Sequence, residues 1–150
     1  MYTVQEAVPG DWAAIEKLYR EAVNGAAWLP PEARLRTDFA TVSQGERVYV
    51  IKECAAEPAG FVSVYEPESF IHHLFVAPQF QRQGLASSLL ASLHKWLPLP
   101  WRLKCVRANT DARSFYVAKG WQEAGAGEGE DGGYLVLEFN QDRKPSIERT

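Results

Sequence analysis

Apolar residues recur along the chain at two spacings, and each spacing predicts one kind of secondary structure. Alternating or continuous apolar runs predict strands, which we expect over residues 2–8, 47–51, 59–65, 70–76, 101–106, 121–124 and 134–139. Apolar residues three and four positions apart predict helices, which we expect over residues 12–23, after Pro30-Pro31, and over residues 85–97 and 110–119. We expect the glycine-rich segment 125–133 to be a flexible loop. The element order indicates one mixed α/β domain over residues 1–140, followed by a polar tail over residues 141–150.

Composition narrows the class of protein without naming a function. A chain of 150 residues fits one domain with its own core. The formal net charge of −3 argues against a nucleic-acid partner, because affinity for a polyanion depends on clustered cations. No apolar run reaches the roughly 18 residues of a membrane span, and the first residues lack the apolar core of a secretion signal. We therefore expect a cytoplasmic protein with no membrane partner, in which Cys54 and Cys105 are buried thiols on strands.

The segment from Phe70 to Ser87 carries the strongest chemical signal. A predicted strand runs into a short loop that leads directly into the N-terminus of an amphipathic helix. Helix N-termini have unpaired backbone N–H groups and a partial positive charge, so they bind phosphate groups. Gly84 allows a ligand to approach the backbone closely, and Arg82 adds a cation. The alternative interpretation is a strand-loop-helix turn in which Gly84 serves packing only. A P-loop and a dinucleotide-binding fold are both excluded, because the lysine of the first and the glycines of the second are absent.

A family resemblance makes this signal specific. The run Gln81-Arg82-Gln83-Gly84-Leu85-Ala86 resembles the acetyl-CoA signature Q/R-x-x-G-x-G/A of the GNAT superfamily, with alanine where glycine is commonest. The resemblance implies a central, mostly antiparallel, splayed sheet of about six or seven strands, flanked by about four helices. It also implies acetyl-CoA as the cofactor, bound at its pyrophosphate by the backbone from Gln81 to Ser87. Its pantetheine arm would contact Leu74, Phe75 and Val76. Homodimers are common in this fold, so a homodimer is one assembly to test.

A second motif lies downstream of the first. The residues Asn109, Ala112, Phe115, Tyr116, Gly120 and Trp121 resemble the N-x-x-A-x-x-[FL]-Y-x-x-x-G-[FW] helix of the same superfamily. The match implies that Asn109, Ala112 and Phe115 contribute to cofactor binding and that Tyr116 protonates the departing thiolate. A phenol with a pKa near 10 suits that role. The structural alternatives are a core aromatic residue at Tyr116 and a simple N-cap at Asn109.

The attacking amine has to lose a proton, and His72 and His73 are the candidate bases. A neutral imidazole accepts a proton near physiological pH. Neighbouring residues of a strand point to opposite faces, so we expect one of these histidines to reach the cleft and no metal site between them. The resemblance favours His72, which aligns with a histidine of some aralkylamine acetyltransferases; Phe70 stands where other members carry a catalytic glutamate. A β-bulge would instead turn His73 inward, and water is a third alternative. We expect the Val76 N–H to polarise the thioester carbonyl.

The acceptor amine is the least defined part of the prediction. In this superfamily the first two helices and their connection shape the acceptor pocket, so Tyr19, Trp28 and Glu32 are candidate substrate residues. Glu32 or Asp38 would hold a substrate ammonium group. We expect an N-acetyltransferase that moves the acetyl group to a primary amine of a small molecule by direct attack in a ternary complex. The alternatives are a protein or peptide N-acetyltransferase and an acyl-CoA-binding sensor without turnover.

Overall fold

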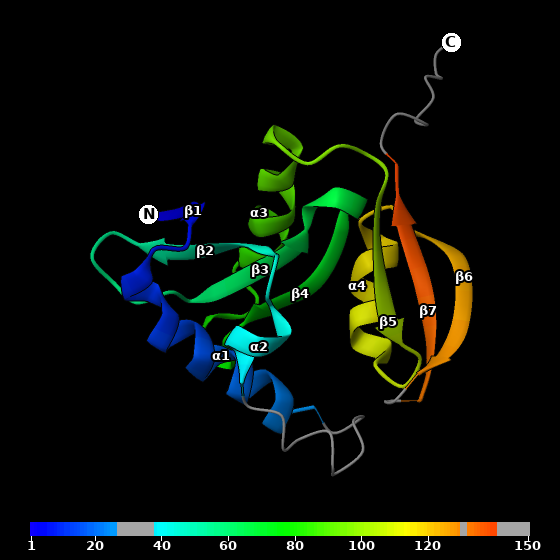
Figure 1. Ribbon diagram of the computed structural model, residues 1–150, viewed down its shortest axis with the longest axis horizontal. Coiled ribbons are helices and arrows are strands. Elements are labelled where there is room, and N and C mark those ends of the chain that lie inside the picture. The colour runs from blue at the N-terminus through cyan, green and yellow to red at the C-terminus, as the bar shows by residue number, and fades with distance from the viewer. Residues whose placement is uncertain (27–37, 130–131, 141–150) are drawn as a thin grey trace.

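The computed structural model describes residues 1–26, 38–129 and 132–140, and in them seven strands form one sheet in the order β1-β2-β3-β4-β5-β7-β6 (Figure 1). The strands are β1 (Tyr2–Glu6), β2 (Arg47–Glu53), β3 (Gly60–Tyr65), β4 (Phe70–Val76), β5 (Trp101–Val106), β6 (Gln122–Gly129) and β7 (Gly132–Phe139). The helices are α1 (Trp12–Asn24), α2 (Phe39–Val42), α3 (Leu85–Ser92) and α4 (Thr110–Ala118), with 3-10 turns η1 (Pro9–Asp11), η3 (Glu66–Glu68), η4 (Pro78–Phe80) and η5 (Leu93–Lys95). The expected mixed, mostly antiparallel architecture is confirmed.

The sheet separates two hydrophobic cores. Helices α3 and α4 pack on one face, where Leu89, Leu93 and Leu137 are fully buried. Helices α1 and α2 pack on the other face, where Ile15 and Phe39 are fully buried. The apolar stripe of α1 faces this second core, as the helical spacing of its apolar residues requires. The face that α1 and α2 cover is the one that receives the two histidines of β4.

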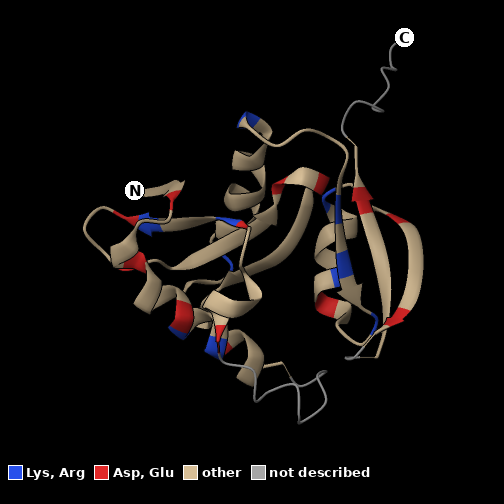
Figure 2. Cartoon of the chain, viewed as in Figure 1, with Lys and Arg blue, Asp and Glu red and all other residues tan. Residues whose placement is uncertain are grey.

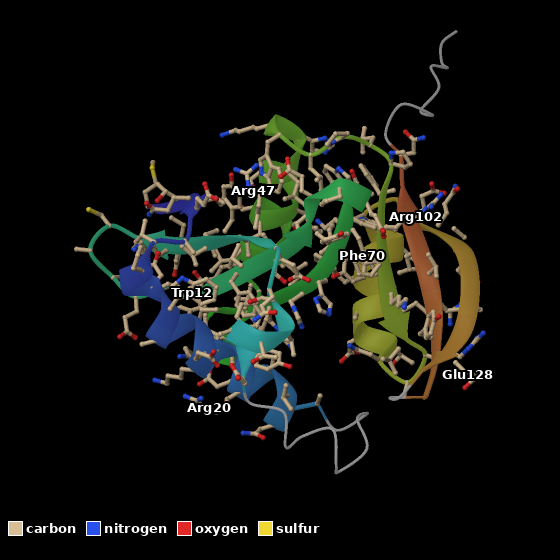
Figure 3. The ribbon with its side chains drawn as sticks, in the orientation of Figure 1. Trp12, Arg20, Arg47, Phe70, Arg102 and Glu128 are labelled. Carbon is tan, nitrogen blue, oxygen red and sulfur yellow. The ribbon has the colours of Figure 1, made fainter. Side chains whose placement is uncertain are left out.

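Strands β4 and β5 are the one parallel pair in the described sheet, and they meet at a single position, Phe70 opposite Arg102. The Arg102 N–H donates to the Ser69 C=O at 3.1 Å. Beyond this point the two strands diverge, with α4 beside the gap (Figure 1). Labels on Phe70 and Arg102 in Figure 3 mark the end at which the gap closes. The splayed sheet that the resemblance implied is therefore present, and one edge of β4 is left without a neighbouring strand.

The glycine-rich segment near the C-terminus is not the expected flexible loop. Most of it belongs to the hairpin of β6 and β7, in which Gly127 lies opposite Tyr134. A Cβ atom at Gly127 would lie 2.5 Å from the Tyr134 hydroxyl oxygen, so glycine leaves room here for an aromatic ring from the opposite strand. The expectation was wrong because glycine here permits close packing of two strands, which the residue type alone does not distinguish from flexibility.

Other sequence expectations have mixed outcomes. Cys105 is buried on β5, but Cys54 is exposed in the turn after β2, and both are free thiols. The predicted helix over residues 85–97 is shorter, because its last turn is the 3-10 segment η5. Lysine, arginine and acidic residues are interspersed over the described chain (Figure 2). None of its helices has the length and apolarity needed to cross a bilayer.

Candidate active site

The C-terminal half of β4 presents main-chain groups to the gap. In an antiparallel ladder, successive residues direct their N–H and C=O groups to opposite sides. The Ala77 N–H donates to the Ala59 C=O at 2.9 Å, on the β3 side, so Phe75 also faces β3. Leu74 and Val76 therefore face the side from which β5 has diverged. Among the three expected partners of a pantetheine arm, the backbone geometry favours Leu74 and Val76, whereas Phe75 packs its side chain in the α1/α2 core.

The loop after β4 has a backbone shape that a phosphate site requires. Arg82 and Gly84 adopt left-handed conformations, with φ of 69° and 78°, and only glycine does so without strain. The Gln81 amide Nε2 donates to the Val76 C=O at 2.8 Å, so this side chain fastens the loop to the end of β4. A Cβ atom at Gly84 would meet no heavy atom within 4 Å. The space in front of α3 is therefore open.

The N-terminus of α3 is free to bind an anion. Within the described part of the chain no side chain caps this helix, so its first amides, which lack partners within the helix, remain available there. The amides belong to Leu85, Ala86 and Ser87, while the Gln83 side chain is exposed beside them. Together with the helix dipole, this row of donors fits a pyrophosphate. The helix begins where the sequence predicted a phosphate cradle, and binding of phosphate there stays a prediction.

Two cations lie beside the loop. An open pocket of about 510 Å³ at the C-terminal end of β4 is lined by Lys17, Arg20, Glu21, Asn24, Gly25, Pro78 and Gln79. Lys17 and Arg20 come from α1, and Figure 3 labels Arg20 on the C-terminal half of that helix. The carboxylate of Glu21 shares this lining with the two cations, so the pocket carries both signs of charge. The residues that line this pocket include neither of the two histidines and no residue of the segment from Gln81 to Ser87.

Strand β4 contains a bulge at its histidines. The register pairs Ser63 with His73 but Val64 with Ile71, so His72 is an additional residue without a partner on β3. The extra residue interrupts the alternation of side chains, and the two imidazole rings lie together, with centroids 4.0 Å apart and 36° between their planes. The expectation that the histidines point to opposite faces is therefore wrong. The reason for expecting no metal site between them fails with it.

His73 is packed into the core beneath α1 and α2. Its ring centroid lies 5.4 Å from those of both Tyr19 and Phe39, and its Nδ1 lies 2.9 Å from the Oγ of the buried Ser63. Burial, with a smaller contribution from His72, lowers the pKa of His73 from 6.5 to about 3. An imidazole with this pKa is neutral at physiological pH and holds a proton weakly. His73 is consequently a poor general base.

His72 is the accessible member of the pair. Its side chain is 39% exposed, while that of its partner Glu46 is 8% exposed. The His72 Nδ1 lies 2.6 Å from the Glu46 Oε2. A neutral ring that donates its Nδ1–H to this carboxylate has Nε2 as its unprotonated nitrogen. The pair therefore offers a proton acceptor whose tautomer a buried carboxylate selects.

Glu46 is the residue that sequence reasoning missed. It stands just before β2, and its neighbour Arg47 pairs with Val64, which in turn pairs with Ile71. Two strand registers thus bring Glu46 next to His72, from 26 residues away in the chain. No local pattern marks such a contact, so only the register of the three strands could have revealed it.

Helix α4 holds the predicted acid. The Asn109 Oδ1 accepts the Ala112 N–H at 3.2 Å, which makes Asn109 the N-cap of α4. The Tyr116 ring is buried and packs edge-on against Phe115 and Trp121, with centroids 5.2 and 5.3 Å away. Burial raises the pKa of the Tyr116 phenol, with a smaller contribution from a neighbouring thiol. The phenol therefore keeps its proton at physiological pH.

Tyr19 and Asp38 are the candidate substrate residues that the structure describes. Tyr19 is buried and stacks obliquely on Phe39, with ring centroids 5.2 Å apart. Trp28 and Glu32 lie outside the described residues. Asp38 accepts hydrogen bonds from the Thr41 hydroxyl at 2.6 Å and the Thr41 N–H at 3.3 Å, and these bonds lower the pKa of its carboxyl. Asp38 thus caps α2, which argues against the proposed contact with a substrate ammonium.

Comparisons with known proteins bear on the family and the fold of the chain. The family model described as "Acetyltransferase (GNAT) domain" matches residues 19–139. No curated protein sequence matches the chain. The apo form of YjaB from Escherichia coli superposes with a TM-score of 0.78 at 17% identity, covering 93% of this chain and 97% of that one.

Two further solved structures share the fold. The yncA protein of Salmonella typhimurium, solved with acetyl-CoA, has a TM-score of 0.72 at 18% identity and covers 97% of this chain and 96% of its own. A mutant of the spermidine N-acetyltransferase SpeG from Vibrio cholerae has a TM-score of 0.68 at 17% identity, with 95% of both chains covered. At these identities the similarity shows the fold.

Proposed function

The chain belongs to the GNAT acetyltransferase family, and we propose that it transfers the acetyl group of acetyl-CoA to the primary amine of a small molecule. The observation that carries the proposal is the continuity of β4 with α3. A strand edge without a neighbour leads through a left-handed loop into an uncapped helix N-terminus. This geometry coincides with the residues of the acetyl-CoA signature, so the sequence motif and the local structure support the same ligand.

The binding role belongs mainly to the backbone. Acetyl-CoA supplies a reactive thioester and a chain of phosphate groups. The amides of Leu85, Ala86 and Ser87 would bind its pyrophosphate. Leu74 would bind the extended arm through its main-chain groups, as a strand binds a neighbouring strand. The Val76 C=O already accepts from Gln81, which leaves the Val76 N–H for the ligand.

The base in this proposal is His72, positioned by Glu46. The acceptor nitrogen forms a bond to the acetyl carbon while the bond from that carbon to sulfur breaks. The proton that the nitrogen loses goes to the His72 Nε2, and the positive charge that develops on the ring lies beside the Glu46 carboxylate. Direct attack in a ternary complex is the simplest scheme, because no residue is required to carry the acetyl group.

Tyr116 and Val76 would stabilise the charge that the reaction creates. The Val76 N–H, which faces the gap, is suited to the developing negative charge on the carbonyl oxygen. A full proton transfer from a phenol with a pKa of at least 10 to a thiolate whose conjugate acid has a pKa near 8.5 is uphill by at least about 2 kcal/mol. Burial of Tyr116 increases that difference. We therefore assign Tyr116 the role of a hydrogen-bond donor to the leaving thiolate, which takes its proton from solvent afterwards.

The proposal is tested by acetyl-CoA-dependent thiol release across a panel of arylamines, polyamines, amino acids, aminoglycosides and peptides. We expect release that depends on one class of small amine, with the acetylated product identified by mass spectrometry. Turnover with peptides alone would reassign the acceptor to a protein. Binding of acetyl-CoA without turnover on any acceptor would favour a sensor, and absence of acetyl-CoA binding would contradict the proposal altogether.

A further inference from the structure

The bulge on β4 assembles three groups that ligate metals. Glu46, His72 and His73 each offer one ligand atom, and these atoms lie within 4.8 Å of one another. They come from two segments that are distant in sequence, the turn before β2 and the middle of β4. Without the bulge, the two imidazoles would lie on opposite faces of the sheet. The convergence therefore depends on an irregularity of the strand, and such irregularities often mark functional sites.

The Glu46 carboxylate carries an unsatisfied oxygen. Its side chain is 8% exposed, and Oε2 accepts from His72, but the buried Oε1 has no hydrogen-bond partner among the residues that the structure describes. Among the ion pairs of the described residues, Glu46 has one partner, His72. A buried carboxylate oxygen without a partner is costly, and a bound cation would remove that cost. The orphaned oxygen is an observation independent of the clustering, and it points to a cationic ligand.

His73 has the hydrogen-bond support that a metal ligand usually has. Its Nδ1 lies 2.9 Å from the Oγ of Ser63, which is fully buried. When Nδ1–H donates to that oxygen, Nε2 presents its lone pair. Histidine ligands characteristically donate their second ring N–H to a protein acceptor in this way, which fixes the tautomer and the orientation of the ring.

The donor set indicates the class of metal. One carboxylate and two imidazoles form a set typical of Zn²⁺, which leaves the fourth position of a tetrahedral site to water. The edge of such a tetrahedron is about 3.3 Å for metal–ligand bonds of about 2.0 Å. The three ligand atoms, which lie within 4.8 Å of one another, are close to that spacing. The hard cations Ca²⁺ and Mg²⁺ prefer a shell of oxygen atoms and fit this set poorly.

We propose that Glu46, His72 and His73 form a binding site for Zn²⁺ or a related divalent transition ion, and that an ion bound there stops acetyl transfer. Inhibition by the ion rests on the proposed function, because the ion would occupy the imidazole that accepts the amine proton. Binding of the ion does not rest on the proposed function. A bound ion would also hold the two segments together, which adds stability in proportion to its affinity for the folded state.

Metal binding is tested by titrating Co²⁺ into chelator-treated, full-length protein that lacks a polyhistidine tag. The exposed Cys54 is replaced by serine in all samples, so that no free surface thiol competes. We expect one equivalent of Co²⁺ to bind with the visible absorption of a four-coordinate ion, and Zn²⁺ to displace it. Glu46→Gln and His73→Gln should each weaken binding at least tenfold, with folding checked by circular dichroism.

Two further variants sharpen the result. The third histidine of the chain, His94, lies outside the cluster, so His94→Gln should bind Co²⁺ as the parent protein does. Ser63→Ala keeps all three ligands and should weaken binding about tenfold through loss of the support on His73. Absence of saturable binding, or equal affinity in Glu46→Gln, would overturn the site.

Inhibition by the ion has a separate readout, the release of thiol from acetyl-CoA. Once an acceptor is known, one equivalent of Zn²⁺ should abolish thiol release, and a chelator should restore it. Full activity of the Zn²⁺-loaded protein would overturn inhibition while leaving the site standing. The cobalt titration needs neither acetyl-CoA nor an acceptor, so failure of the proposed function would not affect it.

Discussion

Strand β4 has two halves that work by different chemistry. In its middle, the bulge gathers side chains, with His72 accessible, His73 packed against Tyr19 and Phe39, and Glu46 beside them. In its C-terminal half, regular alternation turns the main-chain groups of Leu74 and Val76 toward the gap. One half thus offers proton transfer or metal binding, and the other offers a template for an extended ligand.

The difference follows from how β-strands present their groups. A regular strand with no neighbour on one side exposes a row of donors and acceptors, which suits a ligand recognised along its length. A bulge interrupts that row and re-aims side chains, which suits chemistry at a point. We therefore predict that changes in the C-terminal half of β4 and the loop after it alter acetyl-CoA affinity, whereas changes in the bulge alter turnover.

The largest expected effect concerns the loop that leads from the C-terminal half of β4 into α3. Gly84→Glu would place a side chain with φ of 78° and a negative charge in front of the helix N-terminus, where phosphate is expected. We predict loss of measurable acetyl-CoA binding by calorimetry. Gly132→Glu is the matched control, since Gly132 also has a positive φ and open space around its Cβ position. Wild-type affinity in Gly84→Glu would remove the loop from the cofactor site.

The low pKa of His73 in the bulge should make the free energy of unfolding depend on pH in the acidic range. An unfolded histidine titrates near pH 6.5, whereas burial lowers the pKa of folded His73 to about 3. Between these values the unfolded state binds one more proton, so the free energy of unfolding falls by about 1.4 kcal/mol for each pH unit below 6.5. The contribution is fully present above pH 6.5 and is lost progressively toward pH 3.

Urea unfolding in the presence of a chelator measures this dependence. His73→Gln should flatten the slope between pH 6.5 and 4, and His94→Gln should leave it unchanged. An equal slope in wild-type protein and His73→Gln would show that His73 is not held neutral by the core.

Tyr116→Phe tests the opposite side of the gap. Removal of the hydroxyl keeps the buried ring, so we expect acetyl-CoA affinity within about twofold of wild type. Turnover should fall about 10- to 100-fold, because the leaving thiolate loses a hydrogen bond in a dry site. Steady-state kinetics with the best acceptor measures both quantities. Unchanged turnover would exclude Tyr116 from the mechanism.

The smallest expected effect concerns the join between loop and strand. Gln81→Ala removes the bond to the Val76 C=O, worth about 1 kcal/mol, so acetyl-CoA affinity should fall about fivefold with turnover unchanged. Gln83→Ala, which removes an exposed side chain of the same loop, should have a smaller effect. A reversed order would mean that Gln81 does not position the loop.

The sequence predicted where α3 begins after the loop, but it did not predict that Glu46 lies beside the histidines. The difference has a physical reason. Backbone conformation at Gly84 and the start of α3 is encoded locally, in a glycine followed by an amphipathic run, so a short motif suffices. The grouping of Glu46 with the histidines arises from strand register, which depends on residues far apart in the chain. The same limit explains Gly127, whose role is defined only by Tyr134 on the opposite strand.

The most direct test of the account compares turnover and acetyl-CoA affinity in His72→Gln, with His94→Gln as the control. We predict that His72→Gln lowers turnover about 100-fold or more, the range of a lost general base, while calorimetry finds acetyl-CoA affinity unchanged. Turnover equal to wild type would contradict the assignment of His72 as base. A parallel loss of acetyl-CoA affinity would contradict the division of β4 into two separate halves.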